Sequence, residues 1–263
     1  MILTSIKNPR LKAIQDLEKP RNRRSGGLFL IEGLKEIGHA AVAGYEFKTV
    51  VYCKDLIPQS FDINFFKQAA ETIEVTEEVF SKLVIREGSG GILVVAKMKS
   101  HSLSDIQLKK NPLVLVLEAV EKPGNLGAVL RTADGGGVDA VIVCDPQTDP
   151  YNQNVVRSSL GCIFTVPLAL ATSQEAMAWL RSNKVRVVAT HLEASNPYYL
   201  EDFTTGTALI LGTEATGLTD FWWKNADSKI IIPMHGRNDS LNVSNAAAVV
   251  VYEAVRQRSM KKN

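Results

Sequence analysis

Five short, almost continuously apolar segments in the C-terminal half place the strongest constraint on the fold of this 263-residue chain. Strands that are covered on both faces read as unbroken apolar runs, and such strands belong to parallel sheets. Helix-like periodic stretches separate the segments, so the pattern predicts an α/β domain with a parallel sheet. The expected strands are Leu113–Leu117, Ala140–Cys144, Arg186–Thr190, Ala208–Leu211 and Lys229–Ile232, and the expected helices are Asn125–Asp134, Asn152–Leu160, Ser173–Arg181 and Asn242–Gln257.

A smaller α/β pattern precedes this half of the chain. A polar, lysine-containing stretch that ends before Pro112 separates the two patterns. We therefore expect an N-terminal α/β domain over residues 1–98, a linker over 99–111 and a C-terminal domain over 112–263. In the N-terminal domain the expected strands are Leu28–Ile31, Phe47–Tyr52 and Gly91–Ala96, and the expected helices are Gly33–Ala43, Phe61–Glu71 and Glu77–Val84.

The composition narrows the class of protein. A hydrophobic fraction of 45% and a charged fraction of 22% are ordinary for a soluble globular chain. No apolar run is as long as a membrane span, and the N-terminus lacks the apolar core of a signal peptide, so we expect a cytoplasmic protein without membrane association. Cys53, Cys144 and Cys162 are odd in number and far apart, which argues against disulfides and against a metal site.

Positive charge gathers at both ends of the chain. The segment 1–27 carries seven lysines and arginines against Asp16 and Glu18, a net charge of seven minus two, or +5. Basic ends of this kind suit a polyanion such as RNA, although solvated helix faces would give the same pattern. The basic residues are Lys7, Arg10, Lys12, Lys19, Arg21, Arg23 and Arg24 in the first segment, and Arg256, Arg258, Lys261 and Lys262 at the C-terminus.

Three glycine-containing motifs follow strand-like segments in the C-terminal half. They cover Asn125–Ala133, Leu209–Leu218 and Ile231–Ala246. The end of a strand that leads into a helix is where α/β proteins place their ligands. A dinucleotide site is a poor fit, because Gly135–Gly137 follow a helix and the G-x-G-x-x-G spacing after the first strand is absent.

Together the three motifs resemble the SpoU/TrmH family of RNA ribose methyltransferases. The resemblance spans about residues 112–258, and Phe29–Gly33 also resemble the substrate-binding module of that family. It implies a trefoil knot in the C-terminal domain, an N-terminal RNA-binding domain and S-adenosylmethionine as cofactor. It further implies a homodimer whose active sites are shared between protomers, and methyl transfer to a ribose 2′-hydroxyl.

The resemblance also assigns site residues. Gly212, Ile232 and Leu241 stand at the cofactor positions of the family, and Met234 and Thr190 are added because of their places after strands. The residues that match the catalytic positions are Asn125, Arg131, Glu214, Ser240 and Asn242.

The chemistry of the catalytic residues leaves some roles open. The guanidinium of Arg131 suits bidentate phosphate binding, whereas removal of the hydroxyl proton by Arg131 is costly, because a guanidinium is nearly always charged and must first lose a proton to act as a base. Asn125 and Ser240 also fit helix N-caps. Glu214 could pair with Arg131 of a facing protomer.

The function expected first is therefore S-adenosylmethionine-dependent 2′-O-methylation of RNA, with ribosomal RNA preferred because of the N-terminal module. A transfer-RNA 2′-O-methyltransferase and a non-catalytic RNA-binding or ribosome-assembly factor are the alternatives. All five residues at the catalytic positions of the family are present, which argues against a protein that has lost methyltransferase activity. The basic N-terminal segment argues against a third class, a small-molecule-binding protein without nucleic acid.

Overall fold

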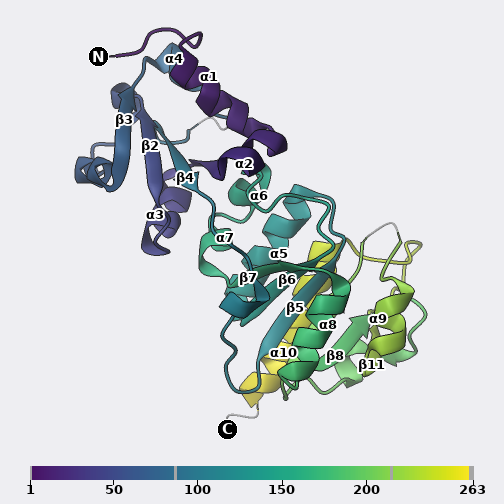
Figure 1. Ribbon diagram of the computed structural model, residues 1–263. Coiled ribbons are helices and arrows are strands. Elements are labelled where there is room, and N and C mark those ends of the chain that lie inside the picture. The colour runs from purple at the N-terminus through teal and green to yellow at the C-terminus, as the bar shows by residue number, and fades with distance from the viewer. Residues whose placement is uncertain (1, 86–87, 214–215, 261–263) are drawn as a thin grey trace. The chain divides into compact units, whose positions relative to one another are not determined.

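The computed structural model describes residues 2–85, 88–213 and 216–260. The chain divides into two compact units, each with its own sheet (Figure 1). One unit comprises residues 1–100 and 149–165, and the other comprises 101–148 and 166–263. Among the described residues, no helix is long and apolar enough to cross a membrane.

The second unit is built on a seven-stranded sheet with the order β7-β6-β5-β10-β8-β11-β9, in which each neighbouring pair is parallel. The predicted α/β class and parallel sheet are thus confirmed, and β7 and β9 are the strands that the apolar pattern missed. The strands are β5 (Leu113–Glu118), β6 (Ala140–Cys144), β7 (Leu168–Ala171), β8 (Arg186–Thr190), β9 (Asn196–Pro197), β10 (Thr207–Leu211) and β11 (Ser228–Ile231). The helical segments are η4 (Leu103–Asp105), α5 (Pro123–Gly135), α8 (Ser173–Ser182), η5 (Tyr198–Leu200), α9 (Asp220–Asn225) and α10 (Val243–Met260).

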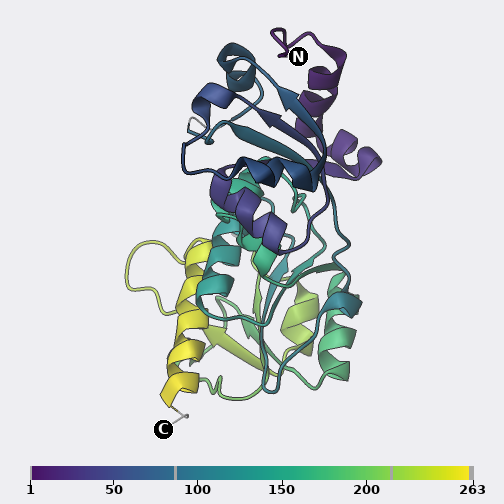
Figure 2. The ribbon, with the colours of Figure 1, turned by 90° about the vertical axis from the view of Figure 1, so that its left-hand side faces the viewer.

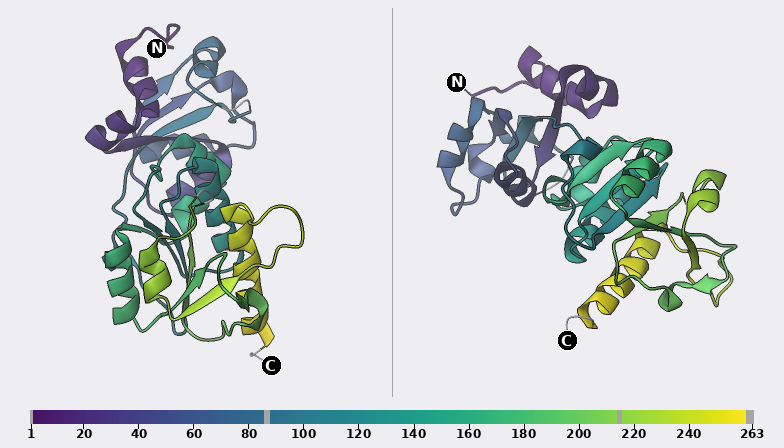
Figure 3. Two further views of the ribbon diagram at one scale, coloured as in Figure 1. Left: turned by 90° about the vertical axis from the view of Figure 1, so that its right-hand side faces the viewer. Right: turned by 60° about the horizontal axis from the view of Figure 1, so that its bottom comes forward.

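Helices cover both faces of this sheet. Figure 1 shows α8 in front of the sheet and α10 behind it, and the left view of Figure 3 shows the same separation. On the face of α8 and α9, Leu180 and Trp222 are fully buried against sheet residues. Leu103 and Leu108 pack against this core, so the expected linker forms part of the domain instead of a polar spacer.

The helices α5 and α10 lie side by side on the other face (Figure 2). A methyl group at Gly136 would come within 2.5 Å of Val251, and one at Gly135 within 2.9 Å of the Tyr252 hydroxyl. The glycine run after the first motif therefore has a packing function, because it lets α5 approach α10 closely.

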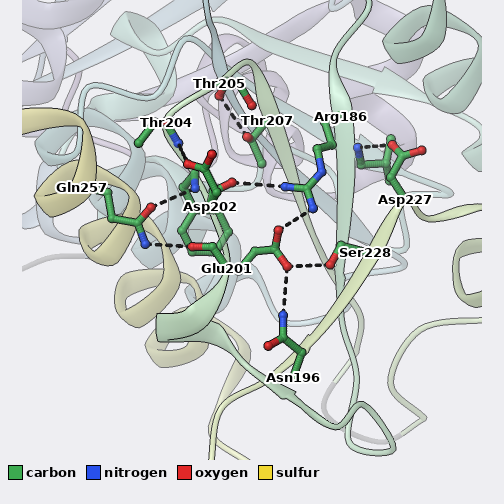
Figure 4. Close-up of polar contacts among 12 residues, drawn as sticks. Arg186, Asn196, Glu201, Asp202, Thr204, Thr205, Thr207, Asp227, Ser228 and Gln257 are labelled. Carbon is green, nitrogen blue, oxygen red and sulfur yellow. Dashed lines mark hydrogen bonds and ion pairs between the residues drawn. The ribbon is translucent and has the colours of Figure 1, made fainter. Parts of the chain in front are cut away.

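Buried polar contacts fix the edge of the sheet (Figure 4). Glu201 is 7% exposed and forms an ion pair with Arg186. The same carboxylate accepts hydrogen bonds from Asn196 at 3.0 Å and from Ser228 at 2.6 Å. On α10, Arg258 donates to four backbone carbonyls, those of residues 111, 112, 203 and 205. Arg258 thus serves the fold, although the sequence pattern counted it among the RNA-facing charges.

The first unit holds a four-stranded sheet with the order β1-β4-β2-β3, in which only the β2–β3 pair is parallel among the described pairings. Its strands are β1 (Leu28–Glu32), β2 (Phe47–Tyr52), β3 (Ala69–Glu74) and β4 (Ile92–Lys97). Its helical segments are α1 (Pro9–Gln15), η1 (Asp16–Glu18), α2 (Pro20–Gly26), α3 (Leu34–Val42), η2 (Lys54–Leu56), η3 (Ile63–Gln68), α4 (Glu77–Ser81), α6 (Gln153–Ser158) and α7 (Cys162–Thr165).

The predicted helix over Phe61–Glu71 is wrong. The segment forms the 3-10 helix η3 and then enters β3. Its aromatic rings pack on one another and on β2, with 5.5 Å between the ring centres of Phe47 and Phe65 and 4.6 Å between those of Tyr52 and Phe66. Ring packing and strand pairing thus outweigh the helical spacing of the apolar residues.

Residues 149–165 group with the first unit, although the expected boundaries placed them in the C-terminal domain. Aromatic packing explains the difference. The ring of Tyr151 lies 4.2 Å from that of Phe29, and the ring of Phe164 lies 5.0 Å from that of Tyr45. Asp149 accepts a 2.8 Å hydrogen bond from a guanidinium nitrogen of Arg23.

Arg23 therefore differs from the other basic residues near the N-terminus. Its side chain is 1% exposed, and it also donates to the carbonyls of Leu17 and Glu18 at 2.9 and 2.7 Å. Its charge is neutralised inside the unit, so the net +5 of the N-terminal segment overstates the charge offered to a polyanion. Leu11 and Ile14 are core residues, which makes this segment part of the fold.

Candidate functional site

A cavity of about 320 Å³ opens at the carboxyl ends of β8, β10 and β11 in the second unit. This edge of a parallel sheet is the usual ligand position in α/β proteins. Four of the five predicted cofactor residues line it, together with the predicted catalytic residue Ser240, whereas Met234 does not line it. The four are Thr190, Gly212, Ile232 and Leu241.

Gly212 is required by the backbone of its own loop. A methyl group at this position would overlap the carbonyl group of Gly217 and the amide nitrogen of Leu218. Thr213 and Gly217 exchange two backbone hydrogen bonds of 3.2 and 3.0 Å, and Gly217 has a φ of +67°. The absence of a side chain at Gly212 thus lets the backbone of Gly217 and Leu218, which line the cavity, lie directly against it.

Asn242 is the N-terminal cap of α10. Its side-chain oxygen accepts the backbone N–H of Ser244 at 2.9 Å, and its side-chain nitrogen donates to Asn125 on α5 at 3.2 Å. The expectation that Ser240 caps this helix is wrong, because the Ser240 hydroxyl contacts Asp239 at 3.1 Å. Asn125 is the third residue of α5 and follows the cap position, so it is no cap either.

Arg131 and Glu214 stand apart from this group. Arg131 lies on α5, is exposed and does not line the cavity. Within the described part of the chain no carboxylate forms an ion pair with it. Glu214 falls outside the described residues. The structure therefore brings together Asn125 and Asn242, and it leaves Arg131 on an open helix face.

Residues that the sequence argument missed also form this site. His191, Glu193 and Asp239 line the cavity. His191 stacks on Trp223 with 4.3 Å between ring centres, and Lys229 lies 4.5 Å above the same indole ring. The sequence signal was weak, because His191 and Glu193 lie in the loop after β8, outside the three motifs, and Asp239 is not among the residues by which the third motif matches the family.

A partly buried polar network holds the chain next to Leu218, one of the residues that line the cavity. Glu118 is 4% exposed at the end of β5 and accepts hydrogen bonds from the backbone and hydroxyl of Thr219 at 2.8 and 2.7 Å. Ser173 joins the network, with its hydroxyl 2.6 Å from Asp145. Burial, aided by the charges of Asp145 and Glu118, raises the pKa of the Cys144 thiol, so the thiol stays protonated.

Removal of Glu118 is expected to destabilise the protein. The substitution Glu118→Ala removes the buried carboxylate that accepts both hydrogen bonds of Thr219, and we expect the free energy of unfolding in urea to fall by about 2 kcal/mol. The exposed neighbour Glu121 is the matched control, and Glu121→Ala should change stability by less than about 0.5 kcal/mol. Equal stability of the two variants would contradict a supporting role of the network.

The comparisons with known proteins identify the family. The model of the SpoU rRNA Methylase family matches residues 112–252, more than half of the chain. This chain belongs to the SpoU rRNA methylase family. A second model, the MRM3-like substrate binding domain, matches residues 8–94, as the resemblance in the N-terminal half predicted.

Relatives of known name align over almost the whole chain. A 23S rRNA (uridine(2479)-2′-O)-methyltransferase of Streptomyces viridochromogenes is 30% identical, with 96% of this chain and 91% of the relative covered. The 23S rRNA (guanosine(2553)-2′-O)-methyltransferase RlmP of Bacillus subtilis is also 30% identical, with 95% and 97% covered. The crystal structure of an AdoMet-bound rRNA methyltransferase from Sinorhizobium meliloti has a TM-score of 0.89, 32% identity and 97% coverage of each chain.

Proposed function

We propose that this SpoU-family protein transfers a methyl group from S-adenosylmethionine to a ribose 2′-hydroxyl of ribosomal RNA, with the large-subunit RNA as the substrate class. The observation that carries the proposal is the cavity of the second unit, whose walls come from the second and third motifs while the first motif contributes Asn125 beside it. The names of the whole-length relatives support ribosomal over transfer RNA.

The cavity fits the cofactor chemically. Leu211, Leu218 and Ile232 supply apolar walls for an adenine ring. Glu193 and Asp239 place carboxylates at a cavity whose described lining residues include no lysine or arginine, which suits a cationic sulfonium and an ammonium group. When bound, the cofactor would supply an electrophilic methyl group. No cluster of metal-ligating side chains occurs among the described residues, and none is required for this transfer.

The remaining groups would bind and orient the RNA. Asn125 and Asn242 bridge the first turns of α5 and α10, where the positive ends of two helix dipoles favour a negatively charged ligand. Arg131 would hold a phosphate bidentately and so align the ribose hydroxyl with the methyl group. Glu214 and Ser240 stay proposed members of the site, and the group that takes the hydroxyl proton is left open.

The partner that completes the site would be a second copy of this chain. Arg131 does not line the cavity of its own protomer, and α10 presents Tyr252, which is 52% exposed, on its outer surface. A two-fold dimer through this region would bring Arg131 of one protomer to the cavity of the other. The trefoil knot and the cytoplasmic location likewise stay predictions that follow from the family.

The first unit would bind the RNA. Lys7, Lys12, Arg21 and Arg24 are exposed, unlike Arg23. Replacing these four residues with Gln should weaken RNA binding and flatten its dependence on salt, because each lost phosphate contact lowers the slope of log K against log salt by about 0.7 to 0.9. Titrations of RNA at several salt concentrations measure this slope.

The exposed lysines Lys54 and Lys67 of the same unit provide the control. Their replacement with Gln should leave the slope near that of the wild type if the N-terminal cluster is the RNA contact. A slope that falls by the same amount per removed charge in both variants would show that charge anywhere on the unit suffices. Point variants are preferable to deletion of this segment, because the deletion would remove Leu11 and Ile14 from the core.

The proposed function is tested by cofactor binding and by methyl incorporation. Calorimetry with S-adenosylmethionine should show binding at one site per chain. Incubation of the protein with labelled cofactor and total RNA should then label the RNA. Cofactor binding without incorporation would favour a non-catalytic RNA-binding factor. Absence of both would contradict the proposal.

A further inference from the structure

Ser244 contacts the site only through another residue. It lies on the first turn of α10 and does not line the cavity. Its backbone N–H donates to the side-chain oxygen of Asn242 at 2.9 Å, and its hydroxyl donates to the same oxygen at 2.6 Å. Two donors from one residue thus converge on one amide oxygen.

These contacts fix the direction of a chain of hydrogen bonds. A backbone N–H can only donate, so the Asn242 atom that faces Ser244 must be the oxygen. The nitrogen of Asn242 then faces Asn125, and because this nitrogen only donates, Asn125 must present its oxygen, as the 3.2 Å contact shows. The contacts of Ser244 thus determine the orientation of the Asn242 amide, and through it that of the Asn125 amide.

We propose that Ser244 is a positioning residue for methyl transfer, whose hydroxyl holds the Asn242 amide in one orientation and thereby sets the orientation of the Asn125 amide. The inference rests on the proposed function. The backbone N–H of Ser244 sets which end of the Asn242 amide faces α10, and the hydroxyl is a second donor that holds the same oxygen more firmly in place. If the side-chain amide of Asn242 rotated by half a turn, its oxygen and nitrogen would exchange places, and donors and acceptors would no longer match in its hydrogen bonds to Ser244 and Asn125.

The first test compares Ser244→Ala, Ser244→Thr and the control Ser259→Ala. Ser259 lies on the same helix, and its hydroxyl donates to the carbonyl of Val255 at 2.8 Å. We expect Ser244→Ala to lower kcat about tenfold, which is the effect of one lost hydrogen bond. The KM for RNA, the cofactor Kd and the Tm should stay close to wild type. The Thr variant, which keeps the hydroxyl, should restore kcat, and Ser259→Ala should leave it unchanged.

The second test is a double-mutant cycle with Asn242→Ala. If Ser244 acts only through Asn242, Ser244→Ala should cause no further loss of kcat in the Asn242→Ala background. An equal loss in both backgrounds, or a kcat of Ser244→Ala within twofold of wild type, would overturn the proposal. A parallel fall in Tm that the Thr variant does not restore would also overturn it, because this would indicate a structural role alone.

A third readout needs no RNA. The side-chain amide signals of Asn242 and Asn125 in NMR spectra should shift in Ser244→Ala and stay unchanged in Ser259→Ala. Unresponsive signals would overturn the proposed orientation. A wild-type protein that methylates no RNA while these signals respond would contradict the proposed function and leave the orientation of the amides intact.

Discussion

Gly212→Ala is expected to abolish measurable binding of S-adenosylmethionine, with an affinity at least about 100-fold below wild type, or about 2.7 kcal/mol. A single methyl group at this position overlaps the backbone of Gly217 and Leu218, and backbone yields less readily than a flexible side chain. The backbone at Gly217 and Leu218 must then move, and both residues line the cavity. Calorimetric titration with the cofactor measures the effect.

A glycine outside the cavity separates this effect from general damage. Gly38 lies within α3, and a methyl group there would contact no atom within 4 Å. Gly38→Ala should therefore bind the cofactor like wild type and should be slightly more stable, because alanine favours a helix. If Gly212→Ala stays folded and binds the cofactor with wild-type affinity, the loop does not form the cofactor site.

Arg131→Ala is expected to lower methyl transfer on the order of 100-fold or more while cofactor affinity stays nearly unchanged. The reason is its place on an exposed face of α5, away from the cavity of its own chain. Arg131→Lys should not restore the rate, because an ammonium group cannot form the two parallel contacts of a guanidinium. Full activity of the Lys variant would show that positive charge alone suffices.

Mixing two inactive variants tests the shared site. When Arg131→Ala and Asn242→Ala chains exchange freely, half of the dimers are mixed, and each mixed dimer holds one intact site if Arg131 serves the partner. About a quarter of wild-type activity should then return. An inactive mixture after confirmed subunit exchange would show that each chain carries its own complete site.

The parallel sheet could be predicted from the sequence because most of its strands are buried on both faces. Such strands consist of nearly unbroken runs of apolar residues. The same rule explains why β9 was missed, because Asn196–Pro197 lies at the edge of the sheet and carries no apolar run. It does not explain β7, since Leu168–Ala171 is a short apolar run. β3 has one large apolar residue, Ile73, and follows an aromatic segment whose spacing resembles that of a helix.

The candidate site shows a similar division. Motif glycines and asparagines marked the loops of the cavity, but their physical roles required coordinates. Gly212 makes room for the chain itself, and Asn242, not Ser240, caps α10. Glu118 carried only a weak signal, an acid that ends an apolar strand, although it accepts two hydrogen bonds from Thr219, next to Leu218 at the cavity. Long-range partners of this kind leave no local pattern in a sequence.

The most direct measurement of the central claim is a map of the methylated nucleotides. Purified wild-type protein and S-adenosylmethionine are incubated separately with unmodified large-subunit rRNA, small-subunit rRNA and transfer RNA, and each product is digested and analysed by mass spectrometry. The account predicts one 2′-O-methylated ribose, located in the large-subunit rRNA by its resistance to alkaline cleavage. Methylation of a base, modification of transfer RNA alone, or no methylation of any RNA would contradict it.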